Sequence, residues 1–546
     1  MVKFVLRLSL WLFCGVLGLQ IFMAFVFPIT GHDSITHLNW LSQFPELFRS
    51  GALYPRWLPK SFWGFGSPAF YFYPPLAYWC AGLSSYVVGT SPIAIYHLEG
   101  FIATLLSIIT FYFFMRVYAI EKKSAFIGAL IYGIHPYRFV DLSLRNSIGE
   151  HWAFVFIPLI LLGIEQAIQS RTRQSTLQSV ALSSIGWAGV LLSNIPTTAI
   201  LLYATPIYYF LRHDRTKNYF SVITIIAGGI IGVFTAALSL LPAFSFSPFI
   251  KVFSIWNFLQ DEGSTGIFIG ATKSGTYVAL VLIFFFDLWI LMRYIRIRRA
   301  QHEHNLMRIL RVFVIIATVI QLPYLFFFGL KFMPLFQYIQ FSYRWNVVAV
   351  LACGMLVAIS HNAKESKLDS RAMIGTMSFL TLLIAASFYF APHNQSWKYQ
   401  ESADHLDVPE YLPAASSNNI EWYRVTLPLH THDPAVVGTN GSEQLTITRD
   451  ESELIDFETN SLRSPLPVVF HRTHFPTWHL RNRRGGEIPL RCDSLGRITA
   501  TLPTISDHYQ LQIVESTPEK TGNLLSQIGV TIILLCGIGA FISAKK

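Results

Sequence analysis

The chain has 546 residues, of which 52% are hydrophobic, 15% aromatic and only 13% charged, about half the usual charged share. This composition excludes an ordinary soluble globular protein and predicts a polytopic membrane protein with one additional soluble part. The formal net charge of +10 does not indicate a nucleic acid partner. Most basic residues stand in short loops between apolar runs, where they set membrane orientation.

We predict about twelve membrane spans, since roughly 20 apolar residues are needed to cross about 30 Å of hydrocarbon. They lie near residues 4–27, 95–117, 122–138, 151–168, 177–194, 195–211, 219–242, 274–293, 308–330, 344–360, 371–391 and 523–543. Lysine and arginine are concentrated in the loops of one side, which predicts that both termini are cytoplasmic. The first outer loop is then 29–94, within a membrane domain of residues 1–391.

The first outer loop is too polar, and too often interrupted by proline and glycine, to cross the bilayer. Its sequence predicts a helix that begins near Asp33 and Ser34 and ends at Gly51, and a second helix after Pro74-Pro75. The apolar face of the first helix consists of Leu38, Leu41, Phe44 and Phe48. An aromatic belt at the lipid headgroups is expected from Trp57, Trp63, Phe70, Phe72, Tyr73 and Trp79.

Asp33 and His37 are four residues apart, so they share one face of the predicted helix. A carboxylate there can act as a general base that takes a proton from an acceptor hydroxyl, with His37 assisting and His32 in support. Ionisable groups at a membrane are costly and therefore indicate function. The alternative is that Asp33 only caps the helix while His37 lies in a polar rim.

The second outer loop, 136–150, is unusually charged for a short connection, with Arg138, Asp141, Arg145 and Glu150. Arginine binds phosphate through a planar fork of donors, so Arg145 and Arg138 are candidate ligands of a lipid phosphate. The alternative is an interfacial arginine paired with Asp141 or Glu150. Glu99, at the start of another span, is expected to pack against an arginine.

Lys273 and Arg344 each stand at the outer end of a predicted span. Snorkelling of a long basic side chain explains such a position on its own. If both converge with Arg145, they form an anion site for a leaving phosphate. The chain has no Walker loop, HExxH motif, CxxC pair or GxSxG motif, which argues against an ATPase, a zinc protease and a serine hydrolase. No cofactor and no metal ligands are predicted.

Residues 392–522 differ in composition from the rest of the chain. Polar and apolar residues alternate at 444–448 and 509–513, and Asn440-Gly441 and Gly485-Gly486 indicate turns. This pattern predicts an outer all-β domain, a small sandwich or jelly roll. Its basic cluster at 481–484 either holds an anionic glycan or forms a solvated turn. Residues 523–546 then form a last span and a cytoplasmic tail.

The order of these motifs resembles the GT-C superfamily of polytopic membrane glycosyltransferases. The similarity lies in Gly31-His-Asp33, Pro74-Pro-Leu-Ala-Tyr-Trp79 and the segment 89–98 that enters the second span. The chain is most similar to the bacterial membrane family named as related to 6-pyruvoyl-tetrahydropterin synthase, with its YfhO-like relatives. The matching segments are Asp33-x-x-x-His37, 51–57 with Arg56, 64–68, 73–76, Tyr137-Arg138, Arg145-x-x-x-x-Glu150, 340–344 and 475–478. Arg56, Glu99 and Glu150 are expected to support the site.

This resemblance implies an inverting transfer of a sugar from a polyprenyl-phosphate donor on the outer side of the bacterial cytoplasmic membrane. The acceptor would be an envelope glycan, a lipid or a protein, and the carboxylate matching Asp33 would be the base. The chain lacks a second acidic residue in the loop until Glu46, so an acidic pair does not carry over. A transporter or flippase, or a non-catalytic assembly protein for lipid-linked glycans, remains an alternative.

Overall fold

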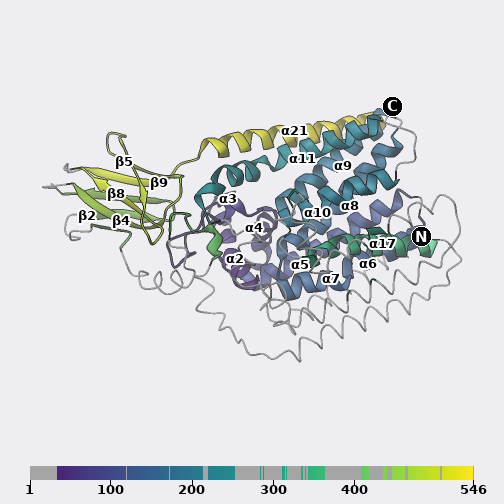
Figure 1. Ribbon diagram of the computed structural model, residues 1–546, viewed down its shortest axis with the longest axis horizontal. Coiled ribbons are helices and arrows are strands. Elements are labelled where there is room, and N and C mark those ends of the chain that lie inside the picture. The colour runs from purple at the N-terminus through teal and green to yellow at the C-terminus, as the bar shows by residue number, and fades with distance from the viewer. Residues whose placement is uncertain are drawn as a thin grey trace, which may run out of the picture.

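A computed structural model shows a helical bundle that is joined at one end to a β-sandwich (Figure 1). It describes residues 33–118, 120–170, 172–212, 219–251, 342–362, 407–416, 434–438, 445–460, 465–503 and 507–544, with a few isolated positions between 283 and 339. The long C-terminal helix α21 begins beside the sandwich and extends along the bundle to its other end (Figure 1).

The described part of the chain contains 5 helices that are long and apolar enough to cross a membrane. They are α5 (Pro92–Arg116), α8 (Ile148–Gln169), α9 (Arg173–Ser193), α11 (Tyr219–Phe246) and α21 (Thr517–Ala544). Five of the predicted spans are thereby confirmed as long apolar helices. Three further helices fall in predicted spans, α6 (Lys122–Ile134), α10 (Ile195–Arg212) and the shorter apolar helix α17 (Asn346–Asn362). The predicted spans at 4–27, 308–330, 274–293 and 371–391 lie wholly or mostly outside the described residues, so the total of about twelve stays a prediction.

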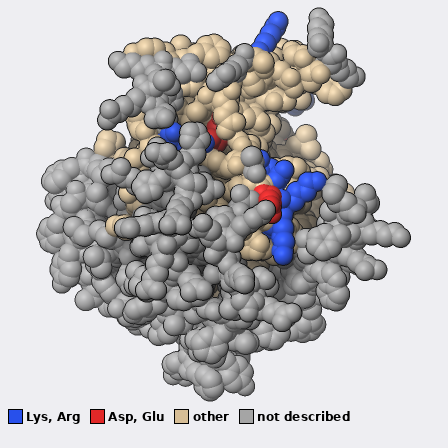
Figure 2. All heavy atoms as spheres, turned by 90° about the vertical axis from the view of Figure 1, so that its right-hand side faces the viewer, with Lys and Arg blue, Asp and Glu red and all other residues tan. Residues whose placement is uncertain are grey.

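Basic residues mark the end of the bundle that lies away from the sandwich. Helix α5 ends at Arg116, α6 begins at Lys122, α9 begins at Arg173 and α10 ends at Arg212. Figure 2 views this end and shows groups of lysine and arginine side chains on its surface. The basic ends of these four helices therefore lie at one end of the bundle, and the orientation of the chain in the membrane stays a prediction.

The first outer loop folds into α2 (Ser34–Arg49), α3 (Ala69–Phe72) and α4 (Leu76–Val88). The predicted apolar face of α2 is confirmed at Leu38, Leu41 and Phe44, which are buried. The helix ends before Gly51, whose φ of +108° suits glycine because a Cβ would be strained there. Both predicted helices of this loop are therefore present.

The predicted aromatic belt is wrong for Trp57 and Phe70. Each side chain is at most 1% exposed, because protein and not lipid covers it. The Trp57 ring packs edge-on against Trp478 of the sandwich at 5.3 Å, and Phe70 packs against Phe44 of α2 at 4.7 Å. Aromatic pairs of this geometry add stabilising free energy beyond that expected from the apolar area they bury. The loop is therefore a folded layer with its own interior.

The β-domain is a sandwich of two antiparallel sheets, which confirms the predicted all-β architecture. One sheet has the order β1 (Val436–Gly438), β4 (Leu466–Thr473), β8 (Arg497–Leu502), β7 (Arg491–Cys492). The other has the order β2 (Leu445–Glu451), β3 (Leu454–Thr459), β9 (His508–Ile513), β5 (Trp478–Asn482), β6 (Glu487–Ile488). Ile455 and Phe457 are buried on either side of the half-buried Asp456, which is the alternation expected of such a sheet.

The core of the sandwich continues into the first loop. Trp57 and Tyr71 belong to the same buried cluster as Phe475 and Trp478. The Thr473 amide donates a hydrogen bond of 2.8 Å to the Phe65 carbonyl. The sandwich is therefore fixed on the loop that contains Asp33, and separating the two would expose apolar rings.

Arg56, a predicted supporting residue, ties this loop to the membrane helices. Its Nε lies 3.1 Å from Oε1 of Glu519 at the start of α21, and its Nη2 donates to the Leu238 carbonyl of α11 at 2.9 Å. The guanidinium also stacks on Tyr54, 3.9 Å from the ring centroid. Because both partners of the ion pair are buried, removing one leaves an uncompensated charge.

We expect Arg56→Ala to lower the free energy of unfolding by roughly 3–5 kcal/mol, the usual cost of removing one partner of a buried pair. The matched control is Lys60→Ala, which removes a 2.8 Å pair with Glu46 whose side chains are 57% and 47% exposed. Exposed pairs contribute about 0–1 kcal/mol. Unfolding of both variants in detergent measures the difference. Equal losses of unfolding free energy would contradict a stabilising role of the buried pair between Arg56 and Glu519.

Candidate functional site

Asp33 and Arg145, predicted separately from two outer loops, lie side by side. The Asp33 amide donates a hydrogen bond of 2.9 Å to the Arg145 carbonyl. Nη2 of Arg145 is 3.8 Å from Oδ2 of Asp33. The Asp33 side chain is 29% exposed and the Arg145 side chain only 4%. The site therefore combines an accessible carboxylate with a guanidinium that the protein holds almost completely.

The structure does not support the capping alternative for Asp33. The residue stands at the N-cap of α2 with φ −97° and ψ 6°, but its side chain makes no capping hydrogen bond. Aspartate at this position normally accepts from an amide of the first turn. The carboxylate lies near Arg145 and is 29% exposed, so a substrate hydroxyl can approach it.

The guanidinium of Arg145 has one anchored nitrogen and one that faces Asp33. Nη1 donates to Oε2 of Glu150 at 2.7 Å and to Oδ1 of Asp141 at 3.2 Å. Nη2 makes no hydrogen bond to any described residue. The guanidinium carbon also lies 5.1 Å from the centroid of the Tyr343 ring. The pairing alternative therefore holds for Nη1, while Nη2 remains a donor for a ligand beside Asp33.

A tight backbone turn places Arg145 in this position. The π-helical segment η1 (Val140–Arg145) ends at Asn146, which has the left-handed conformation (φ +58°) that asparagine tolerates. Nδ2 of the Asn146 side chain donates to the Leu142 carbonyl at 3.0 Å. Single π-helical turns occur frequently at functional sites.

Glu150 stands in the first turn of α8, where the helix dipole favours a carboxylate. It is fully buried and accepts a 2.6 Å hydrogen bond from the Tyr137 hydroxyl through Oε1. Its Oε2 lies 3.6 Å from Nε of Arg344. Glu150 therefore connects two of the predicted phosphate ligands, Arg145 and Arg344.

The charges at this site do not repel an anion. Burial raises the pKa of Asp141 well above its usual range, and the neighbouring Glu150 carboxylate raises it further. A raised pKa favours the uncharged form of Asp141. The side chains of Asp33 and Glu150 face the guanidiniums of Arg145 and Arg344. A phosphate therefore meets a balanced cluster in which Nη2 of Arg145 has no other hydrogen bond to a described residue.

His37 is buried one helical turn after Asp33, so the polar-rim alternative is wrong. Its Nδ1 lies 2.5 Å from the Tyr78 hydroxyl, and its ring packs near those of Trp40 and Tyr73. Burial lowers the pKa of His37 to about 4, although the Asp33 carboxylate opposes this shift. His37 is therefore neutral at neutral pH and supports α2 with a polar contact to α4.

Three other predicted residues lie apart from the Asp33 carboxylate or outside the described residues. Arg138 is buried, donates to Ser107 Oγ at 2.9 Å and to His151 Nε2 at 3.0 Å, and stacks on Phe154. Arg138 therefore ties the second outer loop to α5 and α8. His32 and Lys273 lie outside the described residues.

The expectation that Glu99 packs against an arginine is wrong. One of its oxygens accepts from the Ser84 hydroxyl of α4, and the other accepts from Trp152 Nε1 of α8 at 3.0 Å. Both donors are neutral, and they satisfy the buried carboxyl group without a cation. Glu99 thus joins α4, α5 and α8.

Tyr73, which the sequence prediction assigned to the aromatic belt, lies beside the candidate site. Its ring contacts those of His37 and Trp40, with centroids 5.8 Å and 4.7 Å away. A Cβ built on Gly149 would lie 2.9 Å from the Tyr73 hydroxyl, which places that hydroxyl at the start of α8. Burial and the Asp33 carboxylate raise the pKa of Tyr73, so it is a neutral donor. Its position directly before Pro74-Pro75 was the available signal.

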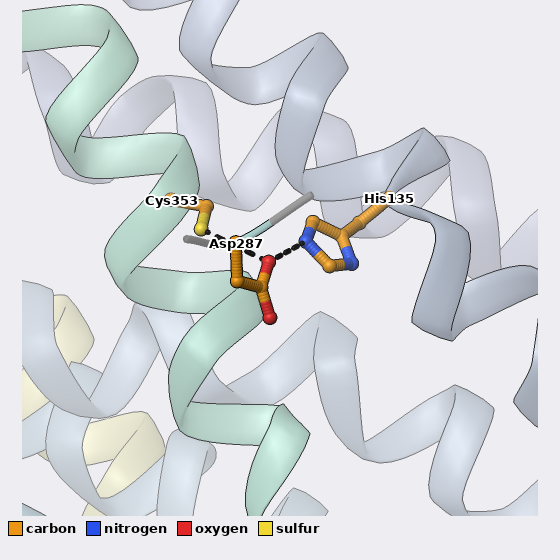
Figure 3. Close-up of side chains that lie close together, drawn as sticks. All are labelled: His135, Asp287 and Cys353. Carbon is orange, nitrogen blue, oxygen red and sulfur yellow. Dashed lines mark hydrogen bonds and ion pairs between the residues drawn. The ribbon is translucent and has the colours of Figure 1, made fainter. Parts of the chain in front are cut away.

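A second cluster, which the sequence did not predict, lies among the helices (Figure 3). His135 Nε2 is 3.0 Å from Oδ1 of Asp287, and Cys353 Sγ is 3.4 Å from the same oxygen. The donor set of nitrogen, oxygen and sulfur is one that binds zinc. However, the Tyr137 amide donates to His135 Nδ1 at 3.2 Å, so the ring proton sits on Nε2. A protonated nitrogen cannot bind a metal, so this arrangement fits a hydrogen-bonded cluster.

No family model and no curated protein match the chain, so its resemblance to the bacterial family stays a prediction. Among solved structures, it is similar to the arabinofuranosyltransferase AftD from Mycobacteria, with 14% identity and a TM-score of 0.43 for a mutant form. That match covers 69% of this chain and 28% of AftD. The chain is also similar to ArnT from Cupriavidus metallidurans bound to undecaprenyl phosphate, with 14% identity, a TM-score of 0.39, and coverage of 69% of this chain and 63% of ArnT.

Proposed function

We propose that the protein is a membrane glycosyltransferase that moves a sugar from a polyprenyl monophosphate to an acceptor hydroxyl. The single observation that carries this proposal is the pair formed by Asp33 and Arg145, 3.8 Å apart. A base for a hydroxyl proton and a donor for phosphate oxygens are the two groups that such a transfer needs.

In the proposed reaction, the acceptor oxygen attacks the anomeric carbon of the donor sugar. The bond between that carbon and the phosphate oxygen breaks, and the electron pair leaves with the polyprenyl monophosphate. Asp33 takes the proton of the acceptor hydroxyl, while Nη2 of Arg145 donates to the departing phosphate. A single displacement inverts the anomeric centre, and Arg344, Tyr73 and Lys273 are further phosphate ligands in this proposal.

We place the reaction on the outer side of the bacterial cytoplasmic membrane, with both termini in the cytoplasm and residues 392–522 outside. The concentration of basic residues at the other end of the bundle supports this orientation. An envelope glycan, a lipid or a protein is the acceptor. The sandwich rests on the loop that contains Asp33, so an acceptor held by the sandwich would be close to the site.

The position of the charges favours this proposal over a flippase or transporter. Transporters bind their substrates near the middle of the membrane, between broken helices. Here Asp33 and Arg145 stand outside the long apolar helices, in the two connections that precede α2 and α8. A non-catalytic assembly protein would need no carboxylate beside an oriented guanidinium.

Mass spectrometry of envelope glycolipids and glycans tests the proposal. We expect cells that lack this chain to lose one sugar from an envelope product and to accumulate the corresponding polyprenyl-phosphate monosaccharide. The wild-type chain should restore the product, and Asp33→Asn should not. Accumulation of a complete lipid-linked oligosaccharide instead would indicate a flippase, and unchanged glycans and lipids would refute the proposed transfer.

A further inference from the structure

A chain of contacts, made of hydrogen bonds and of the residue Tyr137 itself, connects the buried cluster of Figure 3 to Arg145. His135 Nε2 lies 3.0 Å from Asp287 Oδ1, and His135 Nδ1 accepts from the Tyr137 amide at 3.2 Å. The Tyr137 hydroxyl donates to Glu150 Oε1 at 2.6 Å, and Glu150 Oε2 accepts from Arg145 at 2.7 Å. All members of this chain are at most 4% exposed.

The first half of this chain fixes the start of the second outer loop. His135 is the N-cap of α7 (Pro136–Phe139), and its side chain accepts from the second residue of that helix, Tyr137. Because the other ring nitrogen is held by Asp287, the imidazole is fixed on both sides. The backbone of Tyr137 is therefore tied to the interior of the bundle.

The second half fixes the carboxylate that orients Arg145. The terminal torsion of a glutamate is broad, so one hydrogen bond does not determine the plane of its carboxylate. Glu150 is held at both oxygens, by Tyr137 at Oε1 and by Arg145 at Oε2. Without the Tyr137 hydroxyl, Oε1 would lose this donor, and the carboxylate could turn with the guanidinium attached to it.

We propose that Tyr137 is a positioning residue, which holds Glu150 so that Nη2 of Arg145 points to the phosphate site beside Asp33. The inference rests on the proposed function, since it takes a polyprenyl phosphate as the ligand of Arg145. Tyr137 itself need not contact the substrate. Tyr137 contributes by fixing the direction in which the planar Arg145 guanidinium points. A lysine ammonium, which acts as a point charge, would not need such orientation.

The test compares Tyr137→Phe with Tyr132→Phe. Tyr132 is a matched control, because it is equally buried and loses one hydrogen bond of 2.7 Å, to the Phe154 carbonyl. Binding of undecaprenyl monophosphate to the purified full-length protein in detergent is measured for each. Tyr137→Phe should weaken binding about tenfold, which corresponds to one hydrogen bond to a charged group, while Tyr132→Phe should bind as the wild type does.

A double-mutant cycle separates positioning from general loss of structure. Lysine has no fork to orient, so Tyr137→Phe should have little further effect on binding in an Arg145→Lys background. Additive effects would overturn the inference. So would equal binding by Tyr137→Phe and Tyr132→Phe when the wild type binds. If Tyr137→Phe is not recovered folded, Glu150→Gln tests the same link, and wild-type affinity in that variant also overturns it. Failure of the wild type to bind the lipid would instead count against the proposed function.

Discussion

Asp33→Asn should lower kcat for sugar transfer by roughly 10²–10⁴-fold, or about 3–5 kcal/mol of transition-state stabilisation, because asparagine cannot accept the acceptor proton. The side chain of Asp33 makes no capping hydrogen bond, so loss of a cap cannot explain such a result. Asparagine also caps helices as well as aspartate does. The amide retains the size of the side chain and removes only its charge and basicity. Initial rates of the purified variant with a polyprenyl-phosphate sugar measure the effect.

The control for this experiment is Glu46→Gln, on the same helix. Glu46 is exposed and forms an ion pair with Lys60 at 2.8 Å, so this carboxylate takes no part in the pair formed by Asp33 and Arg145. We expect wild-type turnover and unchanged unfolding from this variant. Should folded Asp33→Asn protein transfer sugar as fast as Glu46→Gln, Asp33 is not the base.

Much of the fold follows from local sequence patterns. The helix at Ser34–Arg49 has an apolar face with helical spacing and a glycine after its end, and both signals act over a few residues. The strands of the sandwich likewise follow from alternation and turns. Such features depend on neighbours in the chain, so a single sequence contains them.

The approach of Asp33 to Arg145 could be predicted only in part. Both residues are ionisable groups in outer loops, which indicated a shared side but not a distance of 3.8 Å. That contact depends on the left-handed turn at Asn146 and on Glu150, which anchors the other nitrogen of the guanidinium. The spacing of apolar and polar residues along the sequence does not determine tertiary contacts of this kind.

The buried polar cluster could not be predicted at all. His135, Asp287 and Cys353 come from three distant segments, and each looks like an isolated polar or sulfur-containing residue in its own span. Their association depends on helix packing, as at Gly354, where a Cβ would lie 2.8 Å from the Phe111 ring. Close approach of helices at such positions brings residues together without a motif in the sequence.

The second large effect is expected at Arg145. Arg145→Lys should lower kcat about 10²–10³-fold, the usual cost of losing one preorganised donor to a developing anion. Lysine retains the positive charge beside Asp141 and Glu150, so it avoids an uncompensated buried carboxylate. It lacks the fork, and therefore cannot bind Glu150 through one nitrogen while presenting another to the phosphate.

Arg212→Lys is the matched control for this prediction. Arg212 also pairs with a fully buried glutamate, Glu165, at 3.1 Å, but it lies at the end of the bundle away from the sandwich. Both substitutions keep a charge and lose a fork beside a fully buried glutamate. The Arg212 side chain is 24% exposed and the Arg145 side chain 4%, so Arg212→Lys should destabilise the protein no more than Arg145→Lys does. Only Arg145→Lys should reduce turnover. If both variants reduced kcat equally, lower stability of the bundle would explain the effect. Arg145 would then not be a ligand of the phosphate.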